Sequence, residues 1–268
     1  MVDANVERFS GFAETYDRYR PQPPAVLLDI LTRLAGAPRP RLVVDLGSGT
    51  GISTRLWTGR ADEVVGVEPN ADMRREAETH TQSPVEGTVI RYQEGRSTST
   101  GLPDGCADIV TCSQSFHWME PQPTLAEAAR ILRPGGVFAT IDCDWPPVMT
   151  PEAELAYRRF MRKVEALEAE RRVSVGVHKW PKEHHLKQIE ASGRFRYTRE
   201  VVAHGVETGD AARLVGLATS QGSVAALLKA GISEAEIGLD ELCAEAARTL
   251  GDAPVPWYFG YRVRVGVR

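Results

Sequence analysis

The stretch "VVDLGSGTGIST", residues 43–54, contains three glycines at every second position directly after an apolar run. A short apolar run, a glycine-rich turn and a helical segment beginning near Ile52 predict a buried strand that turns tightly into a helix. Gly47, Gly49 and Gly51 would let the backbone come within contact distance of a ligand. We therefore expect the turn to bind a nucleoside-containing ligand.

The spacing of the glycines separates the classes of nucleotide site. A dinucleotide fingerprint has glycine at the first, third and sixth positions, whereas Ile52 stands at the sixth position here. A phosphate-binding loop would end in Gly-Lys-Ser/Thr, which this turn lacks. Both features disfavour a nicotinamide site and a P-loop.

Strand-like and helical segments alternate along the first half of the chain. Helices are expected over residues 22–35 and 123–133, the second closed by a left-handed glycine cap, and one or two helices over 210–231. This alternation predicts a mostly parallel sheet covered on both faces. Strands are expected at residues 42–46, 64–68, 87–95, 107–115, 135–144, 195–208 and 257–267.

The alternation stops at Pro146, where a charged segment carries an amphipathic pattern around Tyr157 and Phe160. We interpret this segment as a helical cap inserted into one domain spanning 1–268. The expected parts are an N-terminal helical segment, a cofactor-binding half, the cap, and C-terminal strands and helices that complete the sheet: 1–36, 37–145, 146–194 and 195–268.

Composition limits the partners and the location. The net charge of −4 gives no general attraction to nucleic acid, and no run of about 18 apolar residues predicts a membrane span. Residues 1–10 lack a signal-peptide pattern, so a cytoplasmic protein is expected. No metal site is predicted, because the four cysteines (buried free thiols) and His178, His184 and His185 (surface or cap positions) lack ligand spacing. Arg262, Arg264 and Arg268 are expected to be a solvated or sheet-flanking row.

Several motifs together resemble the class I S-adenosylmethionine-dependent methyltransferases. They include Asp45 with the Gly-x-Gly-x-Gly turn, Glu68 at the end of the second strand, and "EAARILRPGG" at 127–136. "FAETYDRYRP" at 12–21 and "QSFHW" at 114–118 are similar to small-molecule enzymes of the trans-aconitate methyltransferase type. The resemblance covers roughly residues 9 to 145.

The resemblance implies a Rossmann-like, doubly wound α/β sheet of seven strands, the last antiparallel, and S-adenosyl-L-methionine as cofactor with S-adenosyl-L-homocysteine as product. A carboxylate suits a ribose diol because each oxygen can accept a hydrogen bond, which is the role implied for Glu68. The cofactor residues implied are Tyr16, Arg20, Asp45, Gly47, Ser48, Gly49, Thr50, Gly51, Glu68, Pro69, Met73, Ser97, Thr98, Ser113 and Gln114.

His117 is the candidate catalytic residue, because it follows the fourth strand at the edge where open α/β sheets bind ligands. It could act as a general base or only line the acceptor pocket with Trp118, Trp145 and Gln221, since an acceptor of low pKa needs no base. We expect methyl transfer to an oxygen, nitrogen or carbon atom of a small molecule, without nucleic acid or membrane as partner.

The family commonly has an acidic residue after the third strand that contacts the adenine amino group. This chain has Arg96, Ser97 and Thr98 there, so the backbone N–H groups or the hydroxyls of Ser97 and Thr98 would contact the base instead. Two alternatives stay open: a non-catalytic S-adenosylmethionine-binding regulator and a nicotinamide-dependent oxidoreductase. Ile52 and the absence of a Tyr-x-x-x-Lys pair disfavour the second.

Overall fold

A computed structural model describes residues 4–8, 10–81 and 84–268, and the chain forms two compact units. The sheet unit comprises the described residues of 22–143, 178–203 and 261–268. The helical unit comprises those of 1–21, 144–177 and 204–260. Three of the expected segments therefore divide between the two units. They are the N-terminal part (1–36), the cap (146–194) and the C-terminal part (195–268).

The sheet has seven strands in the order β3-β2-β1-β4-β5-β7-β6. The strands from β1 to β5 pair in parallel, and β7 pairs antiparallel with β5, which confirms the predicted fold class. Val44 at the centre of β1 lies between Val65 of β2 and Val110 of β4. The strands are β1 (Leu42–Leu46), β2 (Glu63–Val67), β3 (Val89–Gln93), β4 (Ala107–Ser113), β5 (Leu132–Cys143), β6 (Tyr197–Gly209) and β7 (Val255–Val267).

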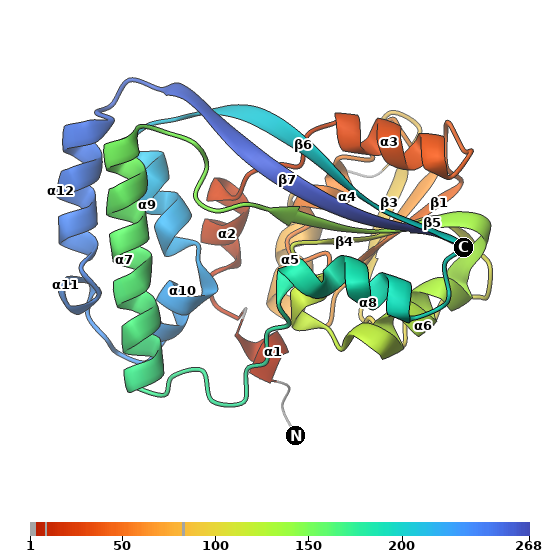
Figure 1. Cartoon of the computed structure of the whole chain (residues 1–268), viewed down its shortest axis with the longest axis horizontal. Helices are drawn as coiled ribbons and strands as arrows, with labels where there is room; N and C mark the ends of the chain where they lie inside the picture. Colours follow the sequence, from red (N-terminus) through yellow and green to blue (C-terminus); the bar gives the residue numbers. More distant parts are fainter. Residues whose placement is uncertain (1–3, 9, 82–83) are drawn as a thin grey trace. The chain divides into compact units, whose positions relative to one another are not determined.

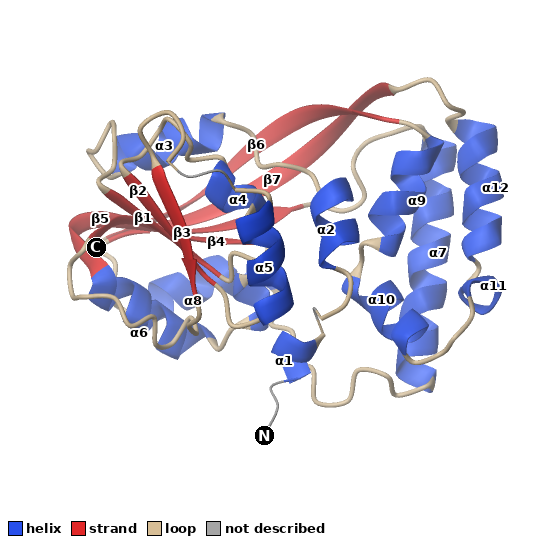
Figure 2. Ribbon diagram, turned by 180° about the vertical axis from the view of Figure 1, so that it is seen from behind, coloured by secondary structure: helices blue, strands red, loops and turns tan. Residues whose placement is uncertain are grey.

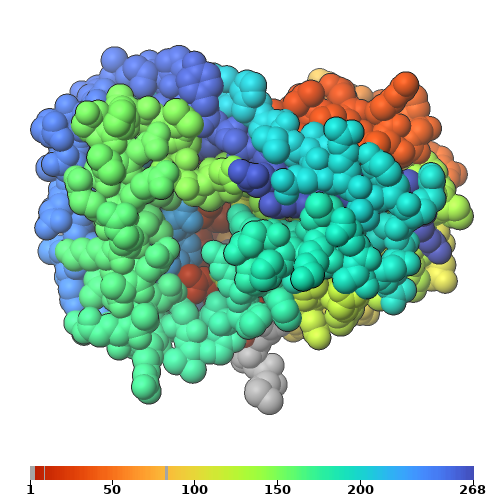
Figure 3. Space-filling model, in the orientation of Figure 1, coloured from red at the N-terminus to blue at the C-terminus, as the bar shows by residue number. Residues whose placement is uncertain are grey.

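Helices cover both faces of the sheet: Figures 1 and 2 show α3 on one side and α6 with α8 on the other. The core beneath α6 contains fully buried Phe116, Leu125 and Phe138. On the side seen in Figure 3, α8 and the start of β6 form much of the surface of this unit. The helices are α3 (Val26–Leu34), α4 (Ile52–Arg55), α5 (Ala71–Thr79), η1 (Phe116–Trp118), α6 (Pro121–Ile131), η2 (Lys182–His184) and α8 (His185–Ala191).

The helical unit is built around α7 (Pro151–Glu170), whose Tyr157, Phe160 and Val164 are buried as the amphipathic pattern predicts. The α2 helix (Ala13–Tyr19) packs on α9 through the Tyr19 ring, which lies where a Cβ on Gly216 would be. The other helices are α1 (Ala4–Glu7), α9 (Ala211–Thr219), α10 (Gly222–Lys229), α11 (Glu234–Ile237) and α12 (Leu239–Thr249). The last two were not predicted from the sequence.

Three local expectations are wrong. The α6 helix ends at Ile131, and the next residue, Leu132, is extended and already begins β5, so no left-handed cap closes the helix. Arg264 is buried and paired with Asp142 and Glu200, so it does not belong to a solvated row. Cys243 is exposed, unlike the buried thiols of Cys112 and Cys143. Among the described residues, no helix has the length and apolar character needed to cross a bilayer.

Candidate functional site

The three glycines of the turn have left-handed backbone angles but different surroundings. A Cβ on Gly47 would lie 2.7 Å from Met119 Cε and 2.8 Å from Ser115 Cβ, so the close packing of these side chains requires glycine at this position. A Cβ on Gly51 would overlap the hydroxyl of Tyr92. A Cβ on Gly49 would have nothing within 4 Å, although its φ is +55°. The backbone at Gly49 is therefore the open part of the turn, as a ligand cradle requires.

Asp45, at the end of β1, supports the turn from below. It is fully buried and accepts hydrogen bonds from Ser53 Oγ (2.6 Å), Thr54 Oγ1 (2.8 Å) and Thr111 Oγ1 (2.9 Å). Burial raises the pKa of this carboxyl above its ordinary value, against the effect of the three hydroxyls. Asp45 thus ties the start of α4 to β4, and its cofactor role stays a prediction.

Glu68, directly after β2, faces the open glycine. Its Oε2 accepts from the Gly49 N–H at 3.0 Å and its Oε1 from the Asn70 N–H at 2.9 Å. Burial raises the pKa of Glu68, while the two backbone donors and Arg74 act in the opposite direction. Each carboxylate oxygen has a second lone pair that a ribose hydroxyl could use.

The remaining predicted residues around the turn fall into three groups. Ser48 Oγ and Thr50 Oγ1 are buried and have no hydrogen-bond partner among the described residues, so both have capacity for a ligand. Met73 is buried on α5, whose start is capped by Asn70 next to the half-buried Pro69. In the turn after β3, Ser97 Oγ bonds Thr124 Oγ1 at 2.9 Å, and Thr98 is exposed. The unpartnered hydroxyls and the open Gly49 fit a bound nucleoside.

His117 lies in η1, in the connection after β4. The residue is 5% exposed, and Nδ1 lies 3.7 Å from Asp142 Oδ1, just beyond hydrogen-bond reach. Burial lowers the pKa of His117 to about 3, so the imidazole is neutral at physiological pH. The Trp118 ring centroid is 4.8 Å away, and the Trp180 N–H donates to the His117 carbonyl at 2.7 Å. A buried neutral imidazole can accept a proton from a bound acceptor.

Ser113 and Gln114 connect β4 to this histidine. Gln114 has a φ of +52° and donates its backbone N–H to the Ile141 carbonyl at 2.8 Å. Its side-chain oxygen accepts from Lys182 Nζ at 2.8 Å. The sequence predicts Gln114 as a cofactor residue but gives no sign of this lysine.

The sequence also missed Asp142, a buried carboxylate on β5. Around it lie His117, His185, Lys182 and Arg264, and we call these five residues the Asp142 cluster. Burial alone would raise the pKa of Asp142, but the two histidines and the charge of Lys182 outweigh it and hold the pKa well below its ordinary value. His185 is fully buried here, which corrects the expectation that it is a surface or cap residue.

Four predicted residues belong to the helical unit, where Arg20 contacts the other three, Tyr16, Trp145 and Gln221. The Arg20 guanidinium lies 4.8 Å from the Tyr16 ring centroid and 5.0 Å from that of Trp145. Its Nη2 donates to Gln221 Oε1 at 2.9 Å and to the Ser220 carbonyl at 2.8 Å. The sequence therefore selected residues that form one contact group within this unit.

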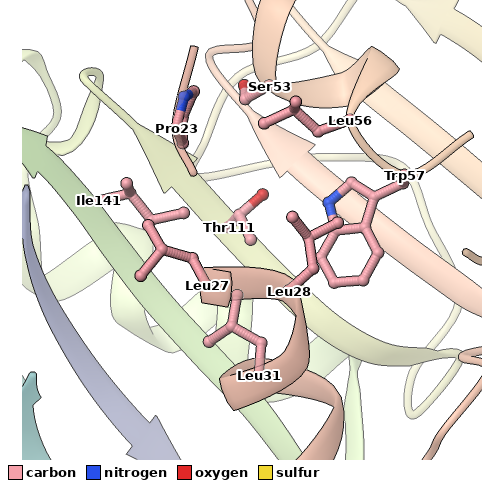
Figure 4. A pocket seen from close by; sticks show the side chains of 9 residues that line it. All are labelled: Pro23, Leu27, Leu28, Leu31, Ser53, Leu56, Trp57, Thr111 and Ile141. Carbon is pink, nitrogen blue, oxygen red and sulfur yellow. The ribbon is translucent and has the colours of Figure 1, made fainter. Parts of the chain in front are cut away.

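One pocket of the sheet unit lies beneath α3 (Figure 4). Two of its side chains, Ser53 and Thr111, already donate to Asp45, and most of the others are apolar. The pocket is lined by Pro23, Leu27, Leu28, Leu31, Ser53, Leu56, Trp57, Thr111 and Ile141. Among the residues that the structure describes, no group of three or more His, Cys, Asp or Glu side chains could hold a metal ion.

Comparison with known protein families gives a match over residues 44–140, which fit the model of a methyltransferase domain. An uncharacterized methyltransferase of Mycobacterium tuberculosis is 34% identical over 128 residues, which are 48% of this chain and 49% of that protein. A malonyl-[acyl-carrier protein] O-methyltransferase of Pectobacterium atrosepticum is 35% identical over 99 residues, 36% of each chain. The chain thus matches about half the length, or less, of these curated relatives.

Solved structures share the fold over a larger part of the chain. A protein from Anaeromyxobacter dehalogenans, provisionally named a type II methyltransferase, has a TM-score of 0.68 at 21% identity and covers 93% of this chain and 98% of its own. The YcgJ protein of Bacillus subtilis has a TM-score of 0.53 at 16% identity, over 90% and 97% of the two chains. These matches confirm the Rossmann-like methyltransferase fold, and the trans-aconitate subtype stays a prediction.

Proposed function

We propose that this chain, which carries a class I methyltransferase domain, binds S-adenosyl-L-methionine and transfers its methyl group to a small-molecule acceptor. S-adenosyl-L-homocysteine is the second product. The observation that carries the proposal is the arrangement of Glu68 against Gly49, where a carboxylate and an open backbone lie side by side. The family match of residues 44–140 supports the cofactor.

Glu68 would hold the ribose hydroxyls, and Gly49 would let the cofactor approach the backbone. Ser48 and Thr50 would add hydroxyl donors, because their side-chain oxygens have no partner among the described residues. The cofactor, when bound, supplies a methyl group already activated by a positive sulfonium. The protein then has to align the acceptor, exclude water and, for a hydroxyl or carbon acid, accept a proton.

His117 is the residue that we propose for the last task. Burial lowers its pKa to about 3, so the imidazole is neutral over the physiological range but is a weak base. Proton uptake would depend on the Asp142 carboxylate, which raises this pKa by stabilising the imidazolium. Trp118 beside it would wall the acceptor pocket. An acceptor that is already ionised would use His117 only for position.

The acceptor is proposed to be a small molecule with an oxygen, nitrogen or carbon nucleophile. The relative from Pectobacterium atrosepticum is named an O-methyltransferase, which makes oxygen acceptors the first to test. The net charge of −4 gives no reason to expect nucleic acid as substrate. A cytoplasmic location stays a prediction from the sequence.

The proposal is tested by incubating the full chain with S-adenosylmethionine and a panel of small carboxylic acids, phenols and amines, with product masses measured. We expect at least one acceptor to gain 14 Da, the mass of a CH₂ unit, with one S-adenosylhomocysteine formed per product. Cofactor binding without turnover on any acceptor would favour the non-catalytic regulator. Oxidation or reduction of an acceptor with a nicotinamide cofactor would favour the oxidoreductase.

A further inference from the structure

We infer that Asp142 is a positioning residue for His117: it accepts the Nδ1–H of the imidazole and leaves Nε2 as the atom that takes the acceptor's proton. This inference rests on the proposed methyl transfer. It assigns a role to a residue of β5 that is far from His117 in sequence.

The two oxygens of Asp142 face different partners. Oδ2 is engaged by His185 Nδ1 at 3.0 Å and by Arg264 Nη1 at 2.9 Å. Oδ1 faces Lys182 Nζ at 3.4 Å and His117 Nδ1 at 3.7 Å. Arg264 and His185 thus fix the carboxylate through one oxygen, and the other is directed at the candidate base.

This carboxylate lies beside His117 Nδ1. Nδ1 is buried and has no hydrogen-bond partner among the described residues, while Asp142 Oδ1 is 3.7 Å away. A shift of less than 1 Å would close a hydrogen bond, because the ordinary N–H to O distance is about 2.9 Å. Catalytic hydrogen bonds often tighten only when ligands bind. The geometry therefore favours the tautomer with hydrogen on Nδ1.

Charged and titratable groups reach His117 from each element packed against it. Asp142 on β5 raises its pKa, whereas Lys182 of η2 and Lys179 just before η2 lower it, on top of the larger effect of burial. His185 on α8 stacks with it at 6.4 Å between ring centroids. Burial raises the pKa of the Cys112 thiol on β4 well above its ordinary value, so Cys112 adds no charge.

The proton balance follows from this arrangement. An acceptor hydroxyl gives its proton to Nε2 while its oxygen forms a bond to the methyl carbon. The bond between that carbon and the sulfonium sulfur breaks, and its electron pair stays on the sulfur of S-adenosylhomocysteine. The imidazole becomes an imidazolium with both nitrogens protonated. Asp142 stabilises that positive charge through Nδ1–H, in a buried environment where such a pair interacts strongly. The proton leaves Nε2 for water when the product departs, which restores the neutral ring.

Lys182 tunes the pair because it competes with His117 for Oδ1. It is partly exposed, and its other contact is the Gln114 side chain, so a neutral substitute should be tolerated by the fold. Removing its charge should raise the pKa of His117, since a nearby cation disfavours the imidazolium. Lys187, exposed on α8, provides a matched control with the same change of charge.

The first test needs no cofactor or acceptor, so its result is independent of the proposed function. Nitrogen-15 NMR of ring-labelled histidine in the full chain, with His117→Gln used to assign the signal, reports the tautomer and pKa of His117. We expect hydrogen on Nδ1, and a pKa higher by about 0.5 to 1 unit in Lys182→Met but unchanged in Lys187→Met. Hydrogen on Nε2, or an unchanged pKa in Lys182→Met, would overturn the inference.

The second test uses turnover once an acceptor is known. Asp142→Asn should lower kcat by about 10- to 1000-fold, leave S-adenosylhomocysteine affinity within about twofold, and change the tautomer of His117. Equal losses in kcat and cofactor affinity would assign Asp142 a structural role only. If Asp142→Asn does not fold, Lys182→Met replaces it: the acid limb of its kcat–pH profile should move upward with the pKa of His117, and an unmoved limb would contradict the inference.

Discussion

Asp45 and Asp142 are both buried carboxylates on strands of one mostly parallel sheet, but their hydrogen-bonding and ionic partners differ. Asp45 accepts three hydroxyl hydrogen bonds, from Ser53, Thr54 and Thr111. Asp142 is surrounded by two histidines, a lysine and an arginine. Burial raises the pKa of Asp45, whereas the charged and imidazole partners lower that of Asp142.

The difference separates a binding region from a region suited to proton chemistry. Neutral donors around the glycine turn hold the backbone in shape and leave Gly49 open. Charged partners around Asp142 fix a carboxylate beside an imidazole. We therefore expect substitutions at the turn to change cofactor binding, and substitutions in the Asp142 cluster to change turnover.

The largest expected effect is on turnover. If His117 is the base, His117→Ala should lower kcat by about 10²- to 10⁴-fold with cofactor affinity nearly unchanged. High pH should partly restore the rate, because the acceptor then ionises without help. A rise confined to the acceptor's KM would instead assign His117 to positioning, and collapse of cofactor affinity in a folded variant would exclude both roles.

Stability should also distinguish the two carboxylates. Asp142→Ala leaves Arg264 and His185 buried beside an absent partner, and should lower the free energy of unfolding by about 3 to 5 kcal/mol. Asp45→Asn keeps an acceptor for the hydroxyls and should lower it by about 1 to 3 kcal/mol. Urea unfolding of both variants measures the difference. Equal losses would contradict the distinction between ionic and neutral partners.

Within the turn, two alanine substitutions should behave differently. Gly47→Ala adds a left-handed alanine and a contact with Ser115 and Met119, and should lower the free energy of unfolding by about 2 to 4 kcal/mol. Gly49→Ala adds only the backbone term of about 1 to 2 kcal/mol, because nothing lies near its Cβ. Gly49→Ala should nevertheless weaken cofactor binding, although it lowers the free energy of unfolding less than Gly47→Ala does, because its methyl group would occupy the space that the cofactor needs. Unchanged affinity in Gly49→Ala would show that the open backbone is not the ligand contact.

The pH dependence of unfolding gives the most gradual signal, because it is spread over several pH units. The pKa of His117 is lowered from 6.5 to about 3 on folding, so between these values the unfolded chain binds more protons. This contribution to stability is complete above pH 6.5 and is lost as the pH falls toward 3, by at most about 1.4 kcal/mol per pH unit. His117→Gln should have a shallower decrease over this window. The same slope in both proteins would contradict a buried neutral histidine.

The same two regions show what the sequence could predict. Asp45, the glycines and Glu68 lie within 24 residues of one another, and the order of strand, turn and strand places them at one sheet edge. The fold class follows from the same alternation, and it is confirmed by the seven-stranded sheet. Local spacing was sufficient because adjacent parallel strands bring their carboxyl ends together.

The Asp142 cluster could not be predicted in this way. Its members come from η1, β5, η2, α8 and β7, and no local spacing connects Asp142 with Arg264, 122 residues later. The alternation of apolar and polar residues in β7 suggested that Arg264 lies in a solvated row. It is buried instead, because β7 lies between β5 and β6 in the sheet. No sequence motif marked His185 either, because its partner Asp142 comes from β5, a strand distant in the sequence.

Cofactor binding is the most direct test of the central claim, and titration calorimetry of the full chain measures it. We expect S-adenosylmethionine and S-adenosylhomocysteine to bind, NAD not to bind, and Glu68→Ala to weaken S-adenosylhomocysteine binding by about 1.5 to 3 kcal/mol through the loss of a charged hydrogen-bond acceptor. Binding of NAD with no signal from S-adenosylmethionine, or full S-adenosylhomocysteine affinity in a folded Glu68→Ala variant, would contradict the account.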